Sequence, residues 1–176
     1  MIIGFGHRSG VGKDTAAQLL KTHLRRNGET VEIRGFASEL KAQAVQLFGW
    51  AGLKDEIFYN NNREKRNEVL PKLGKTPLEL WIEFGEAMRK INPYTWVELV
   101  FANAAADHIL IPDVRHKNEA EIIKHYGGMI IKIERDVPDL TIKNIDKILA
   151  DYDEWDAVVK NDGTMRELND KLLELI

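Results

Sequence analysis

The chain has 176 residues, of which 44% are hydrophobic and 30% charged, and its 25 Lys and Arg against 28 Asp and Glu give a formal net charge of −3. These values predict one globular domain, which at this size buries about two thirds of its unfolded surface, and they argue against nonspecific binding to nucleic acid or to an anionic membrane. The absence of cysteine excludes disulfide scaffolds and Cys-ligated metal sites. We expect a cytoplasmic protein, because MIIGFG is no signal peptide and no apolar run reaches about 18 residues.

The first part of the chain alternates apolar runs with stretches of helical period. Met1–Phe5 predicts a buried strand, which the glycine-rich Gly6–Lys13 follows. Apolar residues at positions 16, 17, 19, 20 and 24 predict an amphipathic helix over Asp14–Arg26, ended by Asn27-Gly28. Thr30–Phe36 is the second expected strand and Ser38–Phe48 the second helix. Gly49–Lys75 is polar and aperiodic, so we expect a mobile, partly helical connector there.

The second part begins with a strong helix signal, because Thr76 and Glu79 form a capping box around Pro77. That helix is expected to run to about Lys90, and another from Pro93 to Ala106. Further expected strands are His108–Ile111, Met129–Glu134 and Ala157–Lys160, and further helices are one that starts at Asn118 and stops at Gly127-Gly128, a short one at 144–150, and a last one capped by Thr164 and Glu167. Such alternation predicts an α/β fold with a parallel sheet covered on both faces.

The most specific motif lies between the first strand and the first helix, from Gly6 to Thr15. Its glycines let backbone N–H groups converge on a polyphosphate at a helix N-terminus, and Lys13 would reach the phosphates. Two features depart from the usual G-x-x-x-x-G-K-[ST] pattern. Five residues separate Gly6 from Gly12, so either the loop has one extra residue or His7 takes the first glycine's place. Asp14 stands where Ser or Thr usually follows the lysine, with Thr15 next.

These departures favour small-molecule and nucleotide kinases of the adenylate kinase type over GTPases, in which that hydroxyl binds the metal directly. Asp14 either binds magnesium through water or favours the helix N-terminus, and the second role is preferred. A glycine-rich turn without a ligand is the alternative, but the strand–loop–helix context favours a nucleotide site. The candidate ATP-binding residues are Gly10, Gly12, Lys13, Asp14 and Thr15.

A second group of polar residues follows the strand His108–Ile111. Asp113 at the carboxyl end of a parallel strand would face the crevice where α/β sheets bind ligands, and Arg115 suits a phosphate. Asp113 either holds magnesium through water or accepts a proton, while a strand-end turn with a surface salt bridge is an equal alternative. On the helices that begin at Pro77 and Pro93, Arg89 and Trp96 suit a phosphate and a base. Trp81 has the spacing of a core residue, and Trp96 is evenly balanced between core and base contact.

Taken together, these motifs resemble those of the deoxynucleoside monophosphate kinases of bacteriophages, a branch of the P-loop nucleoside monophosphate kinases. The similarity runs nearly end to end and lies in the order and spacing of the motifs rather than in any one of them. They are the R-S-G-x-G-K-D-T loop (Arg8–Thr15), F-A-x-x-L-K (Phe36–Lys41), L-G-K-T-P-x-E-L (Leu73–Leu80), F-G-E…R…W (Phe84–Trp96), D-V-R-x-x-N-E-A (Asp113–Ala120), Gly127-Gly128 and N-D-G (Asn161–Gly163).

The resemblance implies a three-layer α/β/α domain spanning 1–176, with a mainly parallel sheet of about five strands. The core would be roughly 1–48 and 107–176, and a helical acceptor-binding insertion roughly 49–106. It also implies transfer of the ATP γ-phosphoryl group to a (deoxy)nucleoside 5′-monophosphate with Mg²⁺, in the host cytoplasm if the chain is phage-encoded. It implies a lid as well, but the region after Arg135 lacks the expected lid pattern and offers Arg135, Lys143 and Lys147 as its basic groups, so no lid arginine is assigned.

By position, the resemblance assigns Lys13, Asp113 and Arg115 to the catalytic centre and Lys41, Arg89, Trp96, Arg115 and Glu119 to the acceptor, with no direct metal ligand assigned. Two alternatives stay open: a kinase of another small phosphorylated metabolite, similar to phosphomevalonate kinases, and a non-catalytic ATP-binding module. The expected partner is a small-molecule nucleotide, not nucleic acid or membrane. The sequence leaves open the bases accepted, the sugar and the oligomeric state, a homodimer included.

Overall fold

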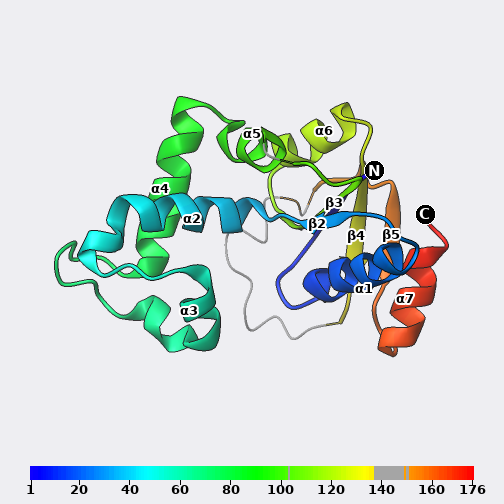
Figure 1. Ribbon diagram of the computed structural model, residues 1–176, viewed down its shortest axis with the longest axis horizontal. Helices are drawn as coiled ribbons and strands as arrows, with labels where there is room; N and C mark the ends of the chain where they lie inside the picture. The colour runs from blue at the N-terminus through cyan, green and yellow to red at the C-terminus, as the bar shows by residue number, and fades with distance from the viewer. Residues whose placement is uncertain (103, 137–148, 150) are drawn as a thin grey trace. The chain divides into compact units, whose positions relative to one another are not determined.

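The computed structural model describes residues 1–102, 104–136, 149 and 151–176 (Figure 1). Except for Leu149, the helix expected at 144–150 lies outside the described residues, as do the basic residues Lys143 and Lys147. The chain divides into two compact units, a sheet unit of residues 1–35 and 103–176 and a helical unit of residues 36–102. The segment 36–48, which was expected in the core, packs within the helical unit against the helices at 77–91 and 95–102.

The sheet unit contains a five-stranded, all-parallel sheet, which confirms the predicted α/β class. Its strands are β1 (Ile2–Gly6), β2 (Val31–Ile33), β3 (His108–Val114), β4 (Met129–Glu134) and β5 (Ala157–Lys160), in the spatial order β2-β3-β1-β4-β5. The strand β1 is central, and the chain proceeds from it to β2 and β3 on one side and to β4 and β5 on the other. This arrangement creates a switch point at the carboxyl end of β1, where sheets of this class bind ligands.

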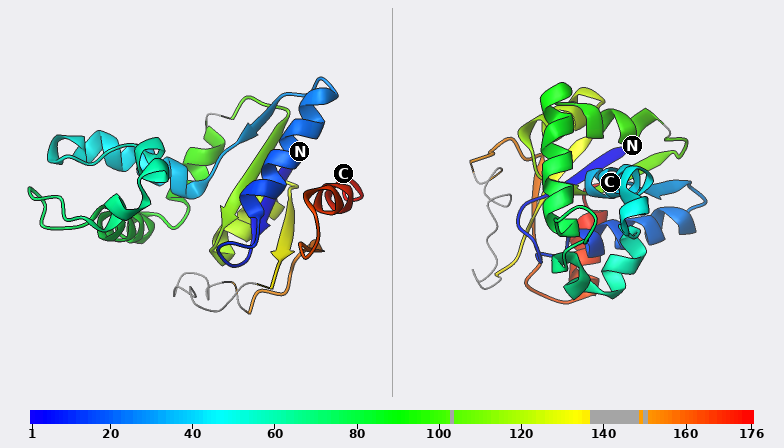
Figure 2. Two further views of the ribbon diagram at one scale, coloured as in Figure 1. Left: turned by 90° about the horizontal axis from the view of Figure 1, so that it is seen from below. Right: turned by 90° about the vertical axis from the view of Figure 1, so that its left-hand side faces the viewer.

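Helices cover both faces of the sheet because side chains alternate along its strands. Ile3 and Phe5 of β1 join the main core with α1 (Lys13–Arg26) and α7 (Met165–Leu173), which lie on the same side of the sheet in Figure 2. Gly4 faces the other side, and a Cβ atom there would lie 2.8 Å from Ile123 of α6 (Lys117–His125). The missing side chain therefore lets α6 pack closely on the sheet.

Two strands differ in length from the sequence-based expectation. The strand expected at 30–36 ends at Ile33, and Phe36 instead begins α2 (Phe36–Phe48), where its side chain is buried. The strand expected to stop at Ile111 continues through Pro112 to Val114. Its register with β1 shifts there, from Gly4–Ile111 to Gly6–Val114. A bulge accommodates a proline, which cannot donate to the strand ladder.

The helical unit consists of α2, η1 (Gly49–Ala51), α3 (Glu56–Asn61), η2 (Arg63–Asn67), α4 (Pro77–Ile91) and α5 (Thr95–Ala102). The capping box predicted at Thr76 is confirmed, since Thr76 Oγ1 accepts the N–H of Glu79 (3.2 Å) and Glu79 accepts the N–H of Thr76 (2.8 Å). The helix expected from Pro93 to Ala106 begins at Thr95 and its described part ends at Ala102; residues 104–106 are not helical. Likewise, α6 begins at Lys117 rather than at Asn118.

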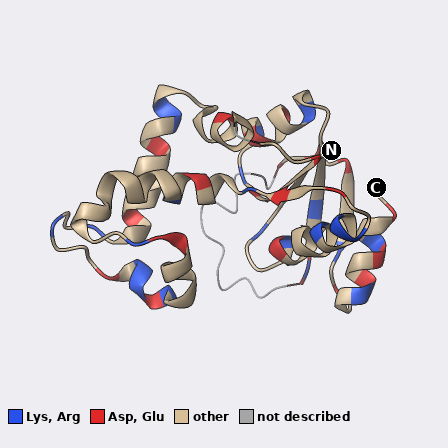
Figure 3. Ribbon diagram, viewed as in Figure 1, with Lys and Arg blue, Asp and Glu red and all other residues tan. Residues whose placement is uncertain are grey.

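Charged residues of both signs are interspersed along the helices. Figure 3 shows Lys and Arg next to Asp and Glu on α1 and on α7. Within the described residues, no helix has the length and apolar character needed to span a membrane.

Candidate active site

The glycine-rich loop joins the central strand β1 to α1, as its sequence predicts. Three of its residues have left-handed backbone angles: His7 with φ 98°, Gly10 with φ 81° and Gly12 with φ 101°. A non-glycine residue adopts such angles rarely. Position 7 is followed by four residues and then Gly12-Lys13, which is the G-x-x-x-x-G-K spacing. His7 therefore has the backbone conformation of the motif's first glycine, which decides between the two sequence-based alternatives.

The His7 side chain is anchored at this strained position. Its Nδ1 lies 3.2 Å from the carbonyl oxygen of Ile133 in β4. Burial lowers the pKa of His7 below its ordinary value, with the neighbouring Lys132 and Arg8 acting in the same direction. The imidazole is therefore neutral near pH 7.

Lys13, the first residue of α1, is folded back over the loop. Only 6% of it is exposed, and its Nζ donates to the carbonyl oxygens of His7 (2.9 Å) and Arg8 (2.5 Å). A buried ammonium group is costly unless it is hydrogen-bonded. The loop carbonyls supply those bonds here, and they hold the Lys13 charge at the helix N-terminus, where an anion is favoured. Asp14 and Thr15 follow in the first turn, and Asp14 is exposed.

The end of β3 lies next to this loop, because Gly6 pairs with Val114 across the two central strands. The structure thus brings Asp113 and Arg115 into the same unit and to the same sheet edge as Lys13. A Cβ atom on Gly35, which follows β2, would lie 3.0 and 3.1 Å from the carboxylate oxygens of Asp113. The glycine at position 35 therefore leaves room for the Asp113 carboxylate.

Glu119 shapes the turn that carries Arg115. Its side chain is 2% exposed, and its Oε2 accepts the backbone N–H groups of Arg115 (2.8 Å) and His116 (3.0 Å). A carboxylate in this position also interacts favourably with the N-terminus of α6. The backbone between β3 and α6 is thus fixed by a buried charge.

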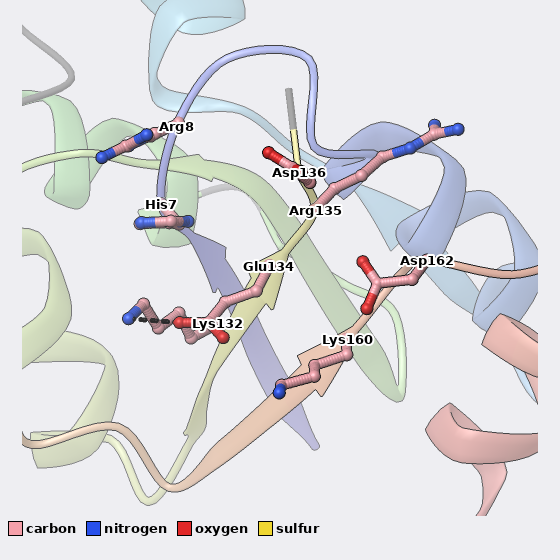
Figure 4. A pocket seen from close by; sticks show the side chains of 8 residues that line it. All are labelled: His7, Arg8, Lys132, Glu134, Arg135, Asp136, Lys160 and Asp162. Atoms are coloured by element: carbon pink, nitrogen blue, oxygen red, sulfur yellow. Dashed lines mark ion pairs between the residues drawn. The ribbon is translucent and has the colours of Figure 1, made fainter. Parts of the chain in front are cut away.

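A cavity of about 510 Å³ opens beside the phosphate loop (Figure 4). It is bounded by the ends of β1, β4 and β5, and its lining consists of His7, Arg8, Lys132, Glu134, Arg135, Asp136, Lys160 and Asp162. Lys132 and Glu134 form an ion pair at 2.6 Å, and the hydrogen bond from Lys132 lowers the pKa of Glu134. With four basic and three acidic residues around a neutral imidazole, the lining offers donors and acceptors for a polar ligand. In the described ranges, no group of three or more His, Asp or Glu is arranged to hold a metal ion.

Two further side chains, the indole of Trp155 and the amide of Asn161, lie against the phosphate loop or the strand that precedes it, and the sequence motifs gave neither of them a role. A Cβ atom on Gly6 would lie 2.5 Å from the ring of Trp155, so this glycine lets the indole pack on the end of β1. Asn161 contacts the loop at Val11. The N-D-G motif marked Asn161 without a role, and nothing local in the sequence connects Trp155 with Gly6, 149 positions earlier.

The remaining predicted site residues lie in the helical unit. Lys41 of α2 donates to Glu56 Oε1 at 2.5 Å, and its Nζ lies 5.5 Å from the centre of the Trp81 ring. Trp81 is 7% exposed, as expected for a core residue. Burial alone would raise the pKa of Glu56, but the hydrogen bond and charge of Lys41 outweigh it and lower that pKa.

Arg89 lies in the last turn of α4, and Trp96 lies in α5 and packs against the middle of α4. Arg89 Nη1 donates to Glu86 Oε1 at 3.0 Å. Trp96 is 2% exposed, packs edge to face on Phe84, and donates its indole N–H to the carbonyl oxygen of Gly85 at 3.3 Å. In this arrangement Trp96 is part of the core of the helical unit, and it supports the segment of α4 that carries Arg89.

No family model matches the chain. It is similar to a putative deoxynucleotide monophosphate kinase of Acanthamoeba polyphaga mimivirus, with 27% identity over 206 aligned positions that cover all of this chain and 96% of that protein. It is also similar to the deoxynucleotide monophosphate kinase of Escherichia phage RB69, with 28% identity over 87 positions, 46% of this chain and 36% of that protein. Among solved structures, shikimate kinase from Aquifex aeolicus aligns over 99% of this chain and 95% of its own, with 15% identity and a TM-score of 0.49. The two viral relatives confirm the resemblance to deoxynucleoside monophosphate kinases that the motifs predicted.

Proposed function

We propose that the protein transfers the γ-phosphoryl group of ATP to a (deoxy)nucleoside 5′-monophosphate and releases the two diphosphates. One observation carries this proposal: a phosphate loop with a buried lysine lies beside a strand end that presents Asp113 and Arg115. The viral relatives, both named as deoxynucleotide monophosphate kinases, support the choice of acceptor. A soluble nucleotide as substrate also favours the host cytoplasm as the site of action.

In this proposal, ATP binds with its phosphates in the loop. The backbone amides of the loop around Gly10 and Gly12 would donate to the phosphate oxygens, and Lys13 would exchange its carbonyl partners for them. Thr15 would contact a phosphate, and Asp14 would favour the helix N-terminus. The cavity beside His7 and Arg8 is the adjoining space for the nucleoside part.

The oxygen donors near the loop suit Mg²⁺, a hard cation that retains waters and binds through few protein carboxylates together with substrate phosphates. Asp113 would hold it through water. When bound, the ion neutralises charge on the donor phosphates.

Phosphoryl transfer requires mainly positioning and charge stabilisation from the protein. A monophosphate oxygen is a good nucleophile near neutral pH, so the acceptor needs no strong general base. Arg115 would hold the acceptor phosphate, with Glu119 fixing the turn that carries it. Lys41 and Arg89 would be further acceptor contacts, and Trp96 would act through the helix that it supports. Lys13 would stabilise the charge that develops as the acceptor oxygen attacks in line with the leaving ADP.

A coupled assay of ADP release tests the proposal. Purified protein with MgATP is offered each common deoxynucleoside and ribonucleoside monophosphate, and separately a phosphorylated metabolite without a base, such as phosphomevalonate. We expect ADP release that depends on at least one nucleoside monophosphate. ADP release with only the base-free acceptor would show that the substrate is not a nucleoside monophosphate. ATP binding without ADP release with any acceptor would show that the protein is a nucleotide-binding module. Sedimentation of the same samples measures the oligomeric state, a homodimer included.

A further inference from the structure

Asn161, directly after β5, is a buried polar residue that the proposed function does not use. Among the described residues, the buried polar or charged side chains are Lys13, Glu119 and Asn161, with Asn161 8% exposed. A buried amide costs free energy unless it is hydrogen-bonded, so its partners indicate what it does. The first two of these residues hold the phosphate loop and the Arg115 turn.

The partners of Asn161 lie in the phosphate loop and in β4. Its Nδ2 donates to the carbonyl oxygen of Val11 at 2.8 Å, across 150 positions of sequence, and its backbone N–H donates to the carbonyl oxygen of Glu134 at 2.7 Å. A Cβ atom on Gly12 would overlap Asn161 Nδ2. The glycine of the motif therefore leaves space for this amide as well as adopting a left-handed φ of 101°.

This bond fixes the orientation of one peptide group in the loop. The Val11 carbonyl and the Gly12 N–H belong to the same planar, trans peptide, so they point in opposite directions. When Asn161 holds the carbonyl, the direction of the Gly12 N–H is set as well. The neighbours of Asn161, Lys160 and Asp162, line the charged cavity, so the same turn borders both the cavity and the loop.

We propose that Asn161 is a positioning residue for the phosphate loop, which it holds in the orientation that receives a polyphosphate. The inference rests on the proposed function, because it concerns the same loop. Asn161 acts through Val11 and Gly12, and its contribution concerns the donor nucleotide and not the acceptor.

Two variants test this, with tripolyphosphate as a probe that has phosphates but no nucleoside. Asn161→Leu keeps a similar shape without a donor, and Asn161→Ala removes the side chain; neither adds a charge. Calorimetric titration is expected to show a loss of affinity of about tenfold for both MgATP and magnesium tripolyphosphate, the scale of one lost hydrogen bond that leaves a buried acceptor unpaired. In steady-state kinetics, the KM for ATP should rise while the KM for the acceptor stays the same.

Asn62→Ala is the matched control, because Asn62 Nδ2 also donates to a carbonyl oxygen at 2.8 Å, that of Phe58 in the helical unit. It should leave tripolyphosphate affinity unchanged. Thermal unfolding checks that each variant is folded, and one folded Asn161 variant is enough for the test. Wild-type affinity for tripolyphosphate in a folded Asn161 variant, or equal rises in both KM values, would overturn the inference. If the wild-type protein itself binds neither probe, the proposed function fails instead.

Discussion

The two units hold their functional side chains by different means. In the sheet unit, main-chain groups hold the buried polar residues: Lys13 donates to loop carbonyls, Glu119 accepts backbone N–H groups, and Asn161 donates to Val11. In the helical unit, carboxylates hold the proposed acceptor cations, Lys41 by Glu56 and Arg89 by Glu86. A main-chain partner is positioned by the fold itself, whereas a carboxylate partner has a charge and geometry similar to those of the phosphate that would replace it.

This difference matches what each ligand requires. A triphosphate tail is the same in every nucleoside triphosphate, so a loop held by the backbone suits it. In the helical unit, a cation that already has a carboxylate partner avoids being desolvated without one while no acceptor is bound. Substituting one residue held by main-chain groups and one held by a carboxylate, and measuring the KM for ATP and for the acceptor, tests this comparison.

The largest effect is expected for Lys13→Ala. The variant loses the charge that the loop holds, so turnover should fall by about 10³-fold or more. The fold should persist, because alanine is a better helix former than lysine and the substitution removes a buried charge. The coupled ADP assay measures turnover and circular dichroism checks the fold. Lys21→Ala on the same helix is the control, and turnover close to wild type in Lys13→Ala would refute the assignment of the loop.

The next effect concerns stability within the helical unit. Trp96→Ala removes a buried indole and should lower the free energy of unfolding by about 3–5 kcal/mol, because Trp96 is 2% exposed. Trp50→Ala is the matched control, since Trp50 is 64% exposed and surface changes stay within about 0.5 kcal/mol. Urea unfolding measures both. Equal losses would show that Trp96 is not a core residue in solution, and Trp96→Phe, which keeps a ring, then reports on base contact through the acceptor KM.

Local sequence signals predicted much of the fold but not its long-range contacts. The capping boxes at Thr76 and Thr164 were predicted correctly because all their groups lie within four residues. The bounds of β4 and β5 followed from short apolar runs between turn residues. The strand expected at 30–36 was too long because Phe36 continues the apolar pattern while tertiary packing places it in α2.

In the candidate site, too, the local motifs could be found in the sequence but the long-range contacts could not. The loop and the Asp113–Arg115 turn are contiguous in sequence and could be found there. Asn161 and Val11 are 150 positions apart, and the Lys41–Glu56 pair joins two helices across an irregular connector. Their contacts depend on packing, which leaves no periodic pattern to detect.

Lys41→Ala is expected to weaken the binding of the acceptor and to leave the binding of ATP unchanged. It removes one charge-assisted contact and should raise the acceptor KM by about tenfold, with the KM for ATP unchanged. Lys75→Ala is a matched control in the same unit, because Lys75 pairs with Glu83 at the same 2.5 Å distance and has no proposed role. Steady-state kinetics with each substrate varied in turn measures both constants. A rise in the KM for ATP of equal size would contradict the assignment of Lys41 to the acceptor.

A smaller effect on stability is expected when the capping hydroxyl is removed from α4 in the helical unit or from α7 in the sheet unit. In Thr76→Ala and Thr164→Ala, the hydroxyl that accepts the third helical N–H is lost, and each should lower the free energy of unfolding by about 1 kcal/mol. Denaturant unfolding measures the loss. A single transition shifted by both substitutions would show that the units unfold together, and two transitions, each shifted by one substitution, would show that they unfold separately.

The smallest effect is a pH dependence at the Lys41–Glu56 pair. Lys41, Ser38 and Arg66 lower the pKa of Glu56 in the folded chain, against the effect of burial. The ionised carboxylate therefore contributes stability that is fully present above the unfolded-state pKa, at about 4.3, and is lost as the pH falls through the lower folded value. Glu56→Gln lacks this contribution, so its deficit in unfolding free energy should be present near pH 7 and shrink in acid.

Glu83→Gln is the control, since Glu83 is 56% exposed in its pair with Lys75 whereas Glu56 is 31% exposed. An exposed pair of this kind contributes little, so its deficit should be near zero at every pH. Urea unfolding of wild type and both variants at about pH 7, 4 and 3 gives the comparison, because the last two values lie below the unfolded-state pKa. A Glu56→Gln deficit that grows in acid would mean that the carboxylate is held in its protonated form. Lys41 would then have no exchangeable anion beside it, and the contrast between the two units would have to be abandoned.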